Sequence, residues 1–184
     1  NTYATIEELA AAGEEEVLRL WQGLGYYSRA RNLHTCAKTI VIDYGGIFPS
    51  TYQELLKLKG VGSYTAAAIA SFAFGKAVPV VDGNVYRVLS RLFGIETDIN
   101  STKAKKEFLE LGNALIPDAD PGTHNQAIME FGAMQCTPHR PNCLFCPLQD
   151  VCVAYKESSQ QRLPVKIKKV KVKNRYFFYF VIIH

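Results

Sequence analysis

Four of the five cysteines in this chain are confined to one short loop, and this constrains the fold more than any other feature. Cys136, Cys143, Cys146 and Cys152 have the spacing C-x6-C-x2-C-x5-C. A disulfide framework would spread its cysteines through a small secreted domain, and the start of the sequence shows no signal-peptide pattern. Clustered thiolates instead indicate a metal site, which by spacing alone suits zinc or a [4Fe–4S] cluster. The remaining cysteine, Cys36, is predicted to be a small buried hydrophobic residue.

Composition and charge narrow the class of protein further. The 184 residues are 48% hydrophobic and 21% charged, as in ordinary globular domains. No apolar run reaches the roughly 20 residues that a membrane helix needs. The formal net charge is +4, but residues 156–175 hold eight Lys or Arg and one Glu. That basic run predicts either a solvated linker or an attraction to nucleic-acid phosphate.

Apolar periodicity predicts a chain that is helical nearly throughout. The predicted helices are residues 6–12, 14–22, 28–44, 51–58, 63–74, 85–93, 102–115 and 125–135. Residues 176–183 are β-branched and aromatic, which is typical of a strand. A single strand is not stable alone, so we expect a domain boundary near residues 157–173 and a chain that is a piece of a longer protein.

Two motifs stand at predicted helix starts. Gly60 and Gly62 bracket the turn before the helix that begins at Ser63, whose free N–H groups would point at the turn. Such a turn is a ready phosphate site, although Gly-x-Gly alone favours a plain helical hairpin. Twenty residues further on, Asp82 precedes another helix, where Asp is also an ordinary N-cap.

These motifs occur together in a known arrangement. The segment 58–66, the Val-Asp-Gly-Asn-Val run at 81–85 and the cysteine loop resemble the helix-hairpin-helix–Gly/Pro-Asp family of DNA glycosylases, over residues 1 to about 156. Three further segments resemble its adenine-removing, MutY-type branch. They are Gly-Leu-Gly-Tyr-Tyr-Ser-Arg at 23–29, Asp-Gly-Asn-Val at 82–85, and His-Asn-Gln-Ala at 124–127 leading to Phe-Gly-Ala at 131–133.

The resemblance implies an all-α fold of two helical domains with DNA in the groove between them. Residues 1–76 would be part of a helical barrel domain with the hairpin, and residues 77–156 a helical iron–sulfur domain. A basic linker at 157–173 would lead into residues 174–184, the first strand of a truncated, Nudix-like α/β domain.

The resemblance also implies two candidate catalytic residues, Asp82 and Tyr64. Removing adenine builds positive charge on the sugar, and a carboxylate such as Asp82 stabilises that charge. Tyr64 occupies the position where strand-cleaving members carry a lysine nucleophile, and a phenol does not form a Schiff base. The glutamate that protonates adenine in this family has no match here, so we expect it upstream of Asn1. Glu7, Glu14 and Glu54 lack the matching surroundings.

Further site residues follow only from the resemblance. The backbone of Gly60, Val61 and Gly62 would grip a phosphate, and Arg140 would contact another. Tyr26 would wedge into the base stack beside 8-oxoguanine, with a core aromatic as the plain alternative. Gln126 would line the adenine pocket, with a helix-surface polar residue as its alternative. The four clustered cysteines would hold a structural [4Fe–4S] cluster.

The implied function is a monofunctional DNA glycosylase of base excision repair. Its partner would be double-stranded DNA with adenine opposite 8-oxoguanine or guanine, and the protein would be a monomer of the bacterial cytoplasm, associated with the nucleoid and not with a membrane. Two alternatives stay open. One is an endonuclease III-like glycosylase with lyase activity on damaged pyrimidines, and the other is a non-catalytic, zinc-stapled DNA-binding module.

Overall fold

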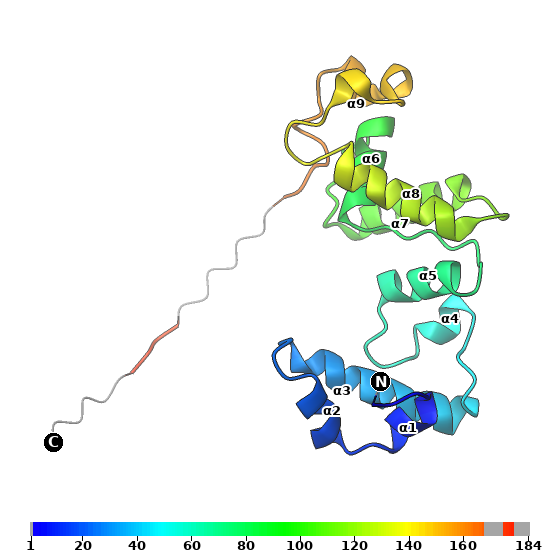
Figure 1. Cartoon of the computed structure of the whole chain (residues 1–184). Coiled ribbons are helices and arrows are strands. Elements are labelled where there is room, and N and C mark those ends of the chain that lie inside the picture. Colours follow the sequence, from blue (N-terminus) through cyan, green and yellow to red (C-terminus); the bar gives the residue numbers. More distant parts are fainter. Residues whose placement is uncertain (1, 168–174, 179–184) are drawn as a thin grey trace.

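The computed structural model describes residues 2–167 and 175–178, and within them the chain is all-helical (Figure 1). All eight predicted helices are present, with small differences at their ends. Their bounds are α1 Ile6–Ala11, α2 Glu14–Leu20, α3 Tyr27–Tyr44, α4 Tyr52–Leu55, α5 Ser63–Phe72, α6 Gly83–Phe93, α7 Thr102–Leu115, α8 Pro121–Met134 and, in addition, α9 Val153–Lys156. Two short 3-10 helices, Cys143–Phe145 and Gln149–Val151, lie in the cysteine loop.

The predicted strand at 176–183 falls mostly outside the described residues. Of it, residues 176–178 are described and have no regular secondary structure. Among the described helices, none combines the length and the apolar character needed to cross a membrane.

The first half of the chain builds one hydrophobic core around α3 and the α4–α5 hairpin. Helices α1 and α2 pack against α3, and α4 packs against α5 (Figure 1). The core is apolar and close to fully buried because each helix turns its apolar positions inward. Its buried members are Cys36, Ile40, Leu55, Leu58, Ala66 and Ala70. The buried position of Cys36 confirms its prediction.

A second core forms where α6 meets α7 and α8. Its buried members are Val85, Leu89, Ala104 and Phe108, and the rings of Tyr86 and Phe108 lie 4.7 Å apart between centroids. Helix α6 packs against α8 and α9, and α8 also contacts α5 of the first half. The extended segment 77–82 therefore connects two helical groups that touch through α5 and α8.

Two helix ends differ from the periodicity-based prediction. α8 begins at Pro121 rather than residue 125, because the Asp120 carboxylate accepts the Thr123 backbone N–H at 3.1 Å and proline fits the first helical position. α4 ends at Leu55 rather than residue 58, because the Leu58 N–H bonds to the Leu55 carbonyl in a tighter three-residue turn.

Candidate functional site

The hairpin turn rests directly on α3. Gly60 has φ +81°, a conformation that glycine adopts without strain. A Cβ at Gly60 would lie 2.6 Å from the Cβ of Asn32 on α3. The turn can therefore approach α3 this closely only because residue 60 has no side chain.

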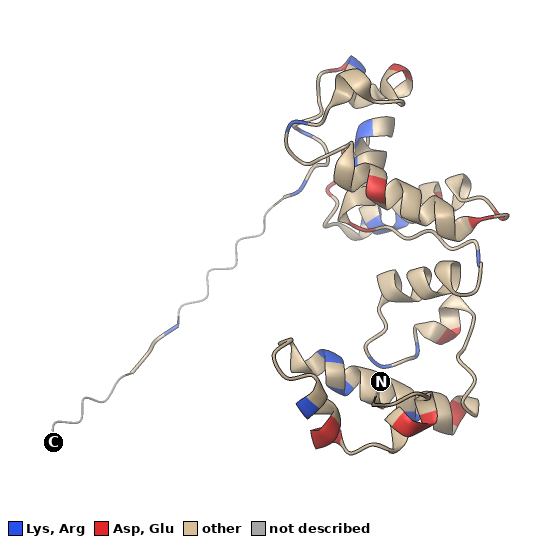
Figure 2. Ribbon diagram, in the orientation of Figure 1, with Lys and Arg blue, Asp and Glu red and all other residues tan. Residues whose placement is uncertain are grey.

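The N-terminus of α5 is open at the mouth of this turn. Gly62 is its N-cap and supplies no side-chain hydrogen bond to the first turn of the helix, so the first N–H groups are free for a ligand. Ser63 is exposed there, and the exposed side chains of Lys57 and Lys59 stand on the turn itself. Figure 2 shows this basic turn in blue, next to α5, which carries no charged residue. Free donors and positive charge together fit a phosphate group.

The loop before α3 presents a strained, exposed aromatic residue. Tyr26 is 81% exposed and lies in the left-handed region with φ 47° and ψ 53°. That conformation is uncommon for a bulky residue and tends to occur at functional sites. The indole N–H of Trp21 donates to the Gly25 carbonyl at 3.0 Å, and this hydrogen bond stabilises the loop one residue before Tyr26. Because Tyr26 is 81% exposed, the alternative that it is a core aromatic residue is wrong.

Asp82 caps α6 and begins a hydrogen-bonded chain. One carboxylate oxygen accepts the backbone N–H groups of Asn84 and Val85, both at 2.8 Å. The other accepts from Asn84 Nδ2 at 3.0 Å, and Asn84 Oδ1 accepts from the Arg87 guanidinium at 2.8 Å. Arg87 Nε in turn donates to the carbonyl of Cys136 at 2.7 Å. The carboxylate is thus fixed in place and connected to the first clustered cysteine.

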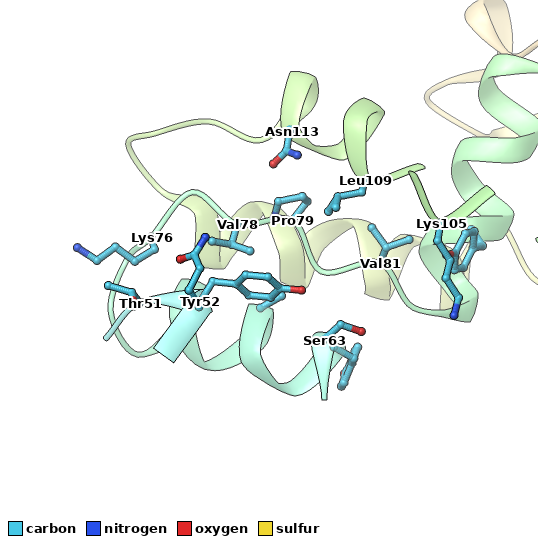
Figure 3. Close-up of a pocket in the computed structure, with 14 residues that line it drawn as sticks. Thr51, Tyr52, Ser63, Lys76, Val78, Pro79, Val81, Lys105, Leu109 and Asn113 are labelled. Atoms are coloured by element: carbon cyan, nitrogen blue, oxygen red, sulfur yellow. The ribbon is translucent and has the colours of Figure 1, made fainter. Parts of the chain in front are cut away.

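A cavity of about 810 Å³ lies between the α4–α5 hairpin and α7, and Asp82 is not among the residues that line it. Tyr64, which is 49% exposed, lines it together with Val81 and Tyr86, which stand close to Asp82 in the sequence. In Figure 3 the side chains of Tyr52 and Ser63 face those of Leu109 and Asn113 across it, with Val78, Pro79 and Val81 between them. Among the described residues that line this cavity there is no carboxylate; the charged ones are Lys76 and Lys105.

Two other predicted site residues lie elsewhere. Gln126 is exposed on α8, donates to Glu130 at 2.7 Å, and borders a separate hollow of about 410 Å³ between α5 and the start of α8. The structure therefore does not bring Gln126 into one pocket with Tyr64. Arg140 is exposed at the tip of the cysteine loop with φ 52°.

All four clustered cysteines line one small cavity next to α6. All are free thiols, each partly buried. Burial raises the pKa of the Cys143 thiol, and the three neighbouring cysteines add to the rise, while Arg91 opposes it. Across the described part of the chain, no group of three His, Cys, Asp or Glu side chains is arranged to hold a metal ion. The cysteines are therefore gathered around a common space without converging on one point.

Two buried arginines face this cysteine loop. Arg87 is 8% and Arg91 3% exposed, and neither has a carboxylate within 4 Å among the described ion pairs. Burial lowers the pKa of Arg87, Arg91 acts in the same direction, and Cys136 and Asp82 oppose the shift. Buried positive charge is costly unless an anion compensates it. Four thiolates holding a metal group would supply that negative charge, so the residues fit such a group.

The carboxylates that sequence reasoning left without a catalytic role include two with local partners. Glu14 forms a 3.1 Å ion pair with Arg31. Glu54 accepts a hydrogen bond from the Thr51 hydroxyl at 2.6 Å while its own N–H donates back to that hydroxyl, which is the N-cap of α4.

Sequence reasoning missed Asn32, Arg87 and Arg91. Asn32 and Arg91 act through partners 28 to 72 residues away, so no local pattern marks them. The one available signal was the pair of arginines four residues apart among the apolar residues of α6.

Comparisons with known proteins agree with this geometry. A family model described as HhH-GPD superfamily base excision DNA repair protein matches residues 1–114. The human protein named adenine DNA glycosylase is 48% identical over 162 residues, 88% of this chain and 30% of the human protein. The adenine DNA glycosylase of Buchnera aphidicola subsp. Acyrthosiphon pisum (strain APS) is 34% identical over 182 residues, 99% of this chain and 52% of that protein.

Two solved structures are also similar. A thermostable thymine-DNA glycosylase has a TM-score of 0.77 and 32% identity over 85% of this chain and 72% of that chain. Endonuclease III in a non-covalent DNA complex has a TM-score of 0.69 and 30% identity over 86% of this chain and 73% of that chain. The chain spans 30% to 52% of the two curated relatives described above. On its sequence and its fold, the chain belongs to the HhH-GPD superfamily of base excision DNA repair proteins.

Proposed function

We propose that the protein containing this chain is a monofunctional adenine DNA glycosylase that acts on adenine opposite 8-oxoguanine or guanine. The observation that carries the proposal is the fixed Asp82 carboxylate, which follows Val81 at the edge of the cavity lined by Tyr64. The proposal is supported by relatives named adenine DNA glycosylase that match nearly the whole chain.

The proposed reaction needs an anion at the sugar and an acid at the base. As the bond between C1′ and adenine breaks, positive charge develops on the deoxyribose, and the Asp82 carboxylate stabilises it. Adenine leaves with a proton on its ring, and water then adds to C1′ and releases a proton to the solvent. The Asn84 amide and the first N–H groups of α6 hold the carboxylate in a fixed orientation.

Tyr64 supports hydrolysis without strand cleavage. Lyase activity needs an amine that condenses with C1′, and a phenol cannot provide one. Lys76 and Lys105 also line the cavity, so this part of the proposal requires that neither lysine attacks the sugar.

The DNA contacts follow from the exposed groups. The N–H groups at Gly60, Val61 and Gly62 would hold a phosphate beside the target nucleotide, which is flipped out of the stack. Tyr26 would fill the gap, since it is 81% exposed at the N-cap of α3. Gln126 would reach the adenine only after DNA binding, and Arg140 would add a phosphate contact.

We infer that Cys136, Cys143, Cys146 and Cys152 hold a [4Fe–4S] cluster. In such a cluster each cysteine binds a different iron atom, which suits thiols that surround a space without converging on one ion. When bound, the cluster supplies structural rigidity and the negative charge that Arg87 and Arg91 require. The hydrolysis itself has no redox step.

We also propose that the acid that protonates adenine is not among the described carboxylates. Glu7, Glu14 and Glu54 lack the sequence surroundings that the family's glutamate has. The two-domain division at residue 76, the linker at 157–173, the Nudix-like segment at 174–184, the monomeric state and the nucleoid-associated location remain predictions.

The test uses the complete gene product that contains this chain and a duplex with adenine opposite 8-oxoguanine. We expect free adenine and an intact strand that breaks only after alkali is added. Strand breakage without alkali would contradict the monofunctional assignment and favour the endonuclease III-like alternative. Tight DNA binding with no base released from adenine or damaged-pyrimidine duplexes would instead favour the non-catalytic module.

A further inference from the structure

Arg91 is the most fully hydrogen-bonded buried side chain around the cysteine loop. Its Nη1 donates to the Cys136 sulfur at 3.3 Å and to the Thr137 carbonyl at 2.8 Å. Its Nη2 donates to the Pro138 carbonyl at 3.2 Å. On the other side, its Nε donates to the Leu163 carbonyl at 3.0 Å. One guanidinium group therefore joins the start of the cysteine loop to the segment that follows the loop.

We propose that Arg91 is a positioning residue that ties segment 159–167 to the metal centre and tunes that centre through its bond to the Cys136 sulfur. The inference rests on the proposed [4Fe–4S] cofactor. It concerns how the chain beyond the cysteine loop is attached, and it goes beyond the glycosylase reaction itself.

The geometry distinguishes Arg91 from its neighbour Arg87. Arg87 faces Asp82 through Asn84 and bonds to the Cys136 and Gly132 carbonyls, but to no sulfur. Arg91 bonds to the sulfur itself and to a carbonyl 72 residues further along the chain. A charged N–H donor on a ligating sulfur withdraws negative charge from the cluster, and hydrogen bonds to the sulfurs are one determinant of its reduction potential.

The backbone of Arg91 contacts a second cysteine. The Cys152 sulfur lies 3.4 Å from the backbone carbonyl of Arg91. Arg91 thus contacts the first and the last of the four cysteines. Without thiolates bound to metal, the buried guanidinium loses its compensating charge and holds Leu163 less firmly.

The segment has other attachments, which supply a matched control. The Ile99 N–H donates to the Val165 carbonyl at 3.0 Å, and Arg162 pairs with Glu96 at 2.6 Å on the surface, where their side chains are 60% and 58% exposed. An exposed pair contributes little. Arg162→Gln therefore removes an arginine contact to the same segment without touching the cysteine loop.

The experiment compares the full-length wild type with Arg91→Gln, Arg91→Lys and Arg162→Gln. Iron and sulfide content, the reduction potential by protein-film voltammetry, and the rate of tryptic cleavage after Lys166 are measured for each. For Arg91→Gln we expect a more negative potential and about tenfold faster cleavage, since a charged buried hydrogen bond is lost. Arg91→Lys keeps the positive charge but loses the forked set of donors. Its potential and cleavage rate should therefore lie between those of the wild type and Arg91→Gln. Arg162→Gln should keep the wild-type potential and change cleavage by no more than about twofold.

An Arg91→Gln protein with the wild-type potential and cleavage rate would overturn the proposal. A change in cleavage alone would overturn the tuning role and leave a merely structural anchor. A wild type without iron and sulfide would overturn the proposed cofactor, and the cleavage rates would then decide the anchoring role separately.

If the Arg91 variants do not fold, the anchoring role is tested on the wild-type protein by removing its metal. Removing its metal by oxidation and chelation should accelerate cleavage after Lys166 about tenfold, while cleavage after Lys38 on α3 stays unchanged. Unchanged cleavage after Lys166 would overturn the proposal.

Discussion

The hairpin turn and the cysteine loop each press against a helix, but different forces hold them there. The turn meets α3 through the bare backbone of Gly60 against Asn32, above an apolar core. The cysteine loop meets α6 through Arg87 and Arg91, whose donors are taken up by carbonyls and a sulfur. Close packing stabilises the first region, and hydrogen bonds from buried, charged guanidinium groups stabilise the second.

This difference matches what each region has to bind. A turn held by apolar packing can leave the N–H groups at the start of α5 free for an external anion. A loop held by buried guanidinium groups needs an internal anion, because uncompensated buried charge is destabilising. The contrast predicts that the hairpin is stable without ligand and that the cysteine region is not stable without metal.

The largest effect should come from the cysteine region. Cys143→Ser is expected to lower the free energy of unfolding by about 3–5 kcal/mol, because metal loss leaves Arg91 uncompensated. Cys36→Ala is the control, with an expected loss of about 0.5–1.5 kcal/mol from a small cavity in the first core. Denaturant unfolding with iron analysis measures both. Equal losses of unfolding free energy in Cys143→Ser and Cys36→Ala would contradict the claim that the cysteine region depends on bound metal.

A smaller effect should separate two glycines of the same turn. Gly60→Ala is expected to cost about 2 kcal/mol, because alanine is strained at φ +81° and its Cβ meets Asn32. Gly62→Ala should cost less, about 0.5–1 kcal/mol, because alanine is a poorer N-cap than glycine but a Cβ there meets nothing within 4 Å. Unfolding curves and DNA titrations test the pair. A Gly60→Ala protein as stable as Gly62→Ala would show that Asn32 does not support the turn.

The smallest effect should be at the surface of the cysteine region. Arg162→Gln removes an ion pair in which both side chains are more than half exposed. The expected loss of stability is about 0.5 kcal/mol or less, and it should shrink further in high salt. A loss above about 2 kcal/mol would mean that surface charge, and not buried charge, holds this region.

The sequence predicted the helices well because their apolar stripes are local. Its errors at α4 and α8 came from the ends, where hydrogen bonds and not periodicity decide the boundary. The Asp120-Pro121 signal for the start of α8 was present in the sequence and was not used. Asp82 was recognised both as a helix cap and as a catalytic candidate, and the structure bears out the cap.

The buried arginines could not be predicted in the same way. Arg91 is surrounded by groups from residues 136–138 and 163, which only the folded chain brings together. The cysteine motif predicted a metal site but did not indicate which residues balance the charge of that site or orient its ligands. The site residues that a motif carries were therefore accessible from sequence, and the residues that support them were not.

The most direct test of the central claim measures adenine release in single turnover from a duplex with adenine opposite 8-oxoguanine. The complete protein is compared with its Asp82→Asn variant. Asparagine is as good an N-cap as aspartate, so α6 should remain intact and circular dichroism should be unchanged. Our account predicts release by the wild type and a loss of at least about a hundredfold in the variant, because the stabilising charge is gone. Equal release by both proteins would contradict it and leave Asp82 as a helix cap alone.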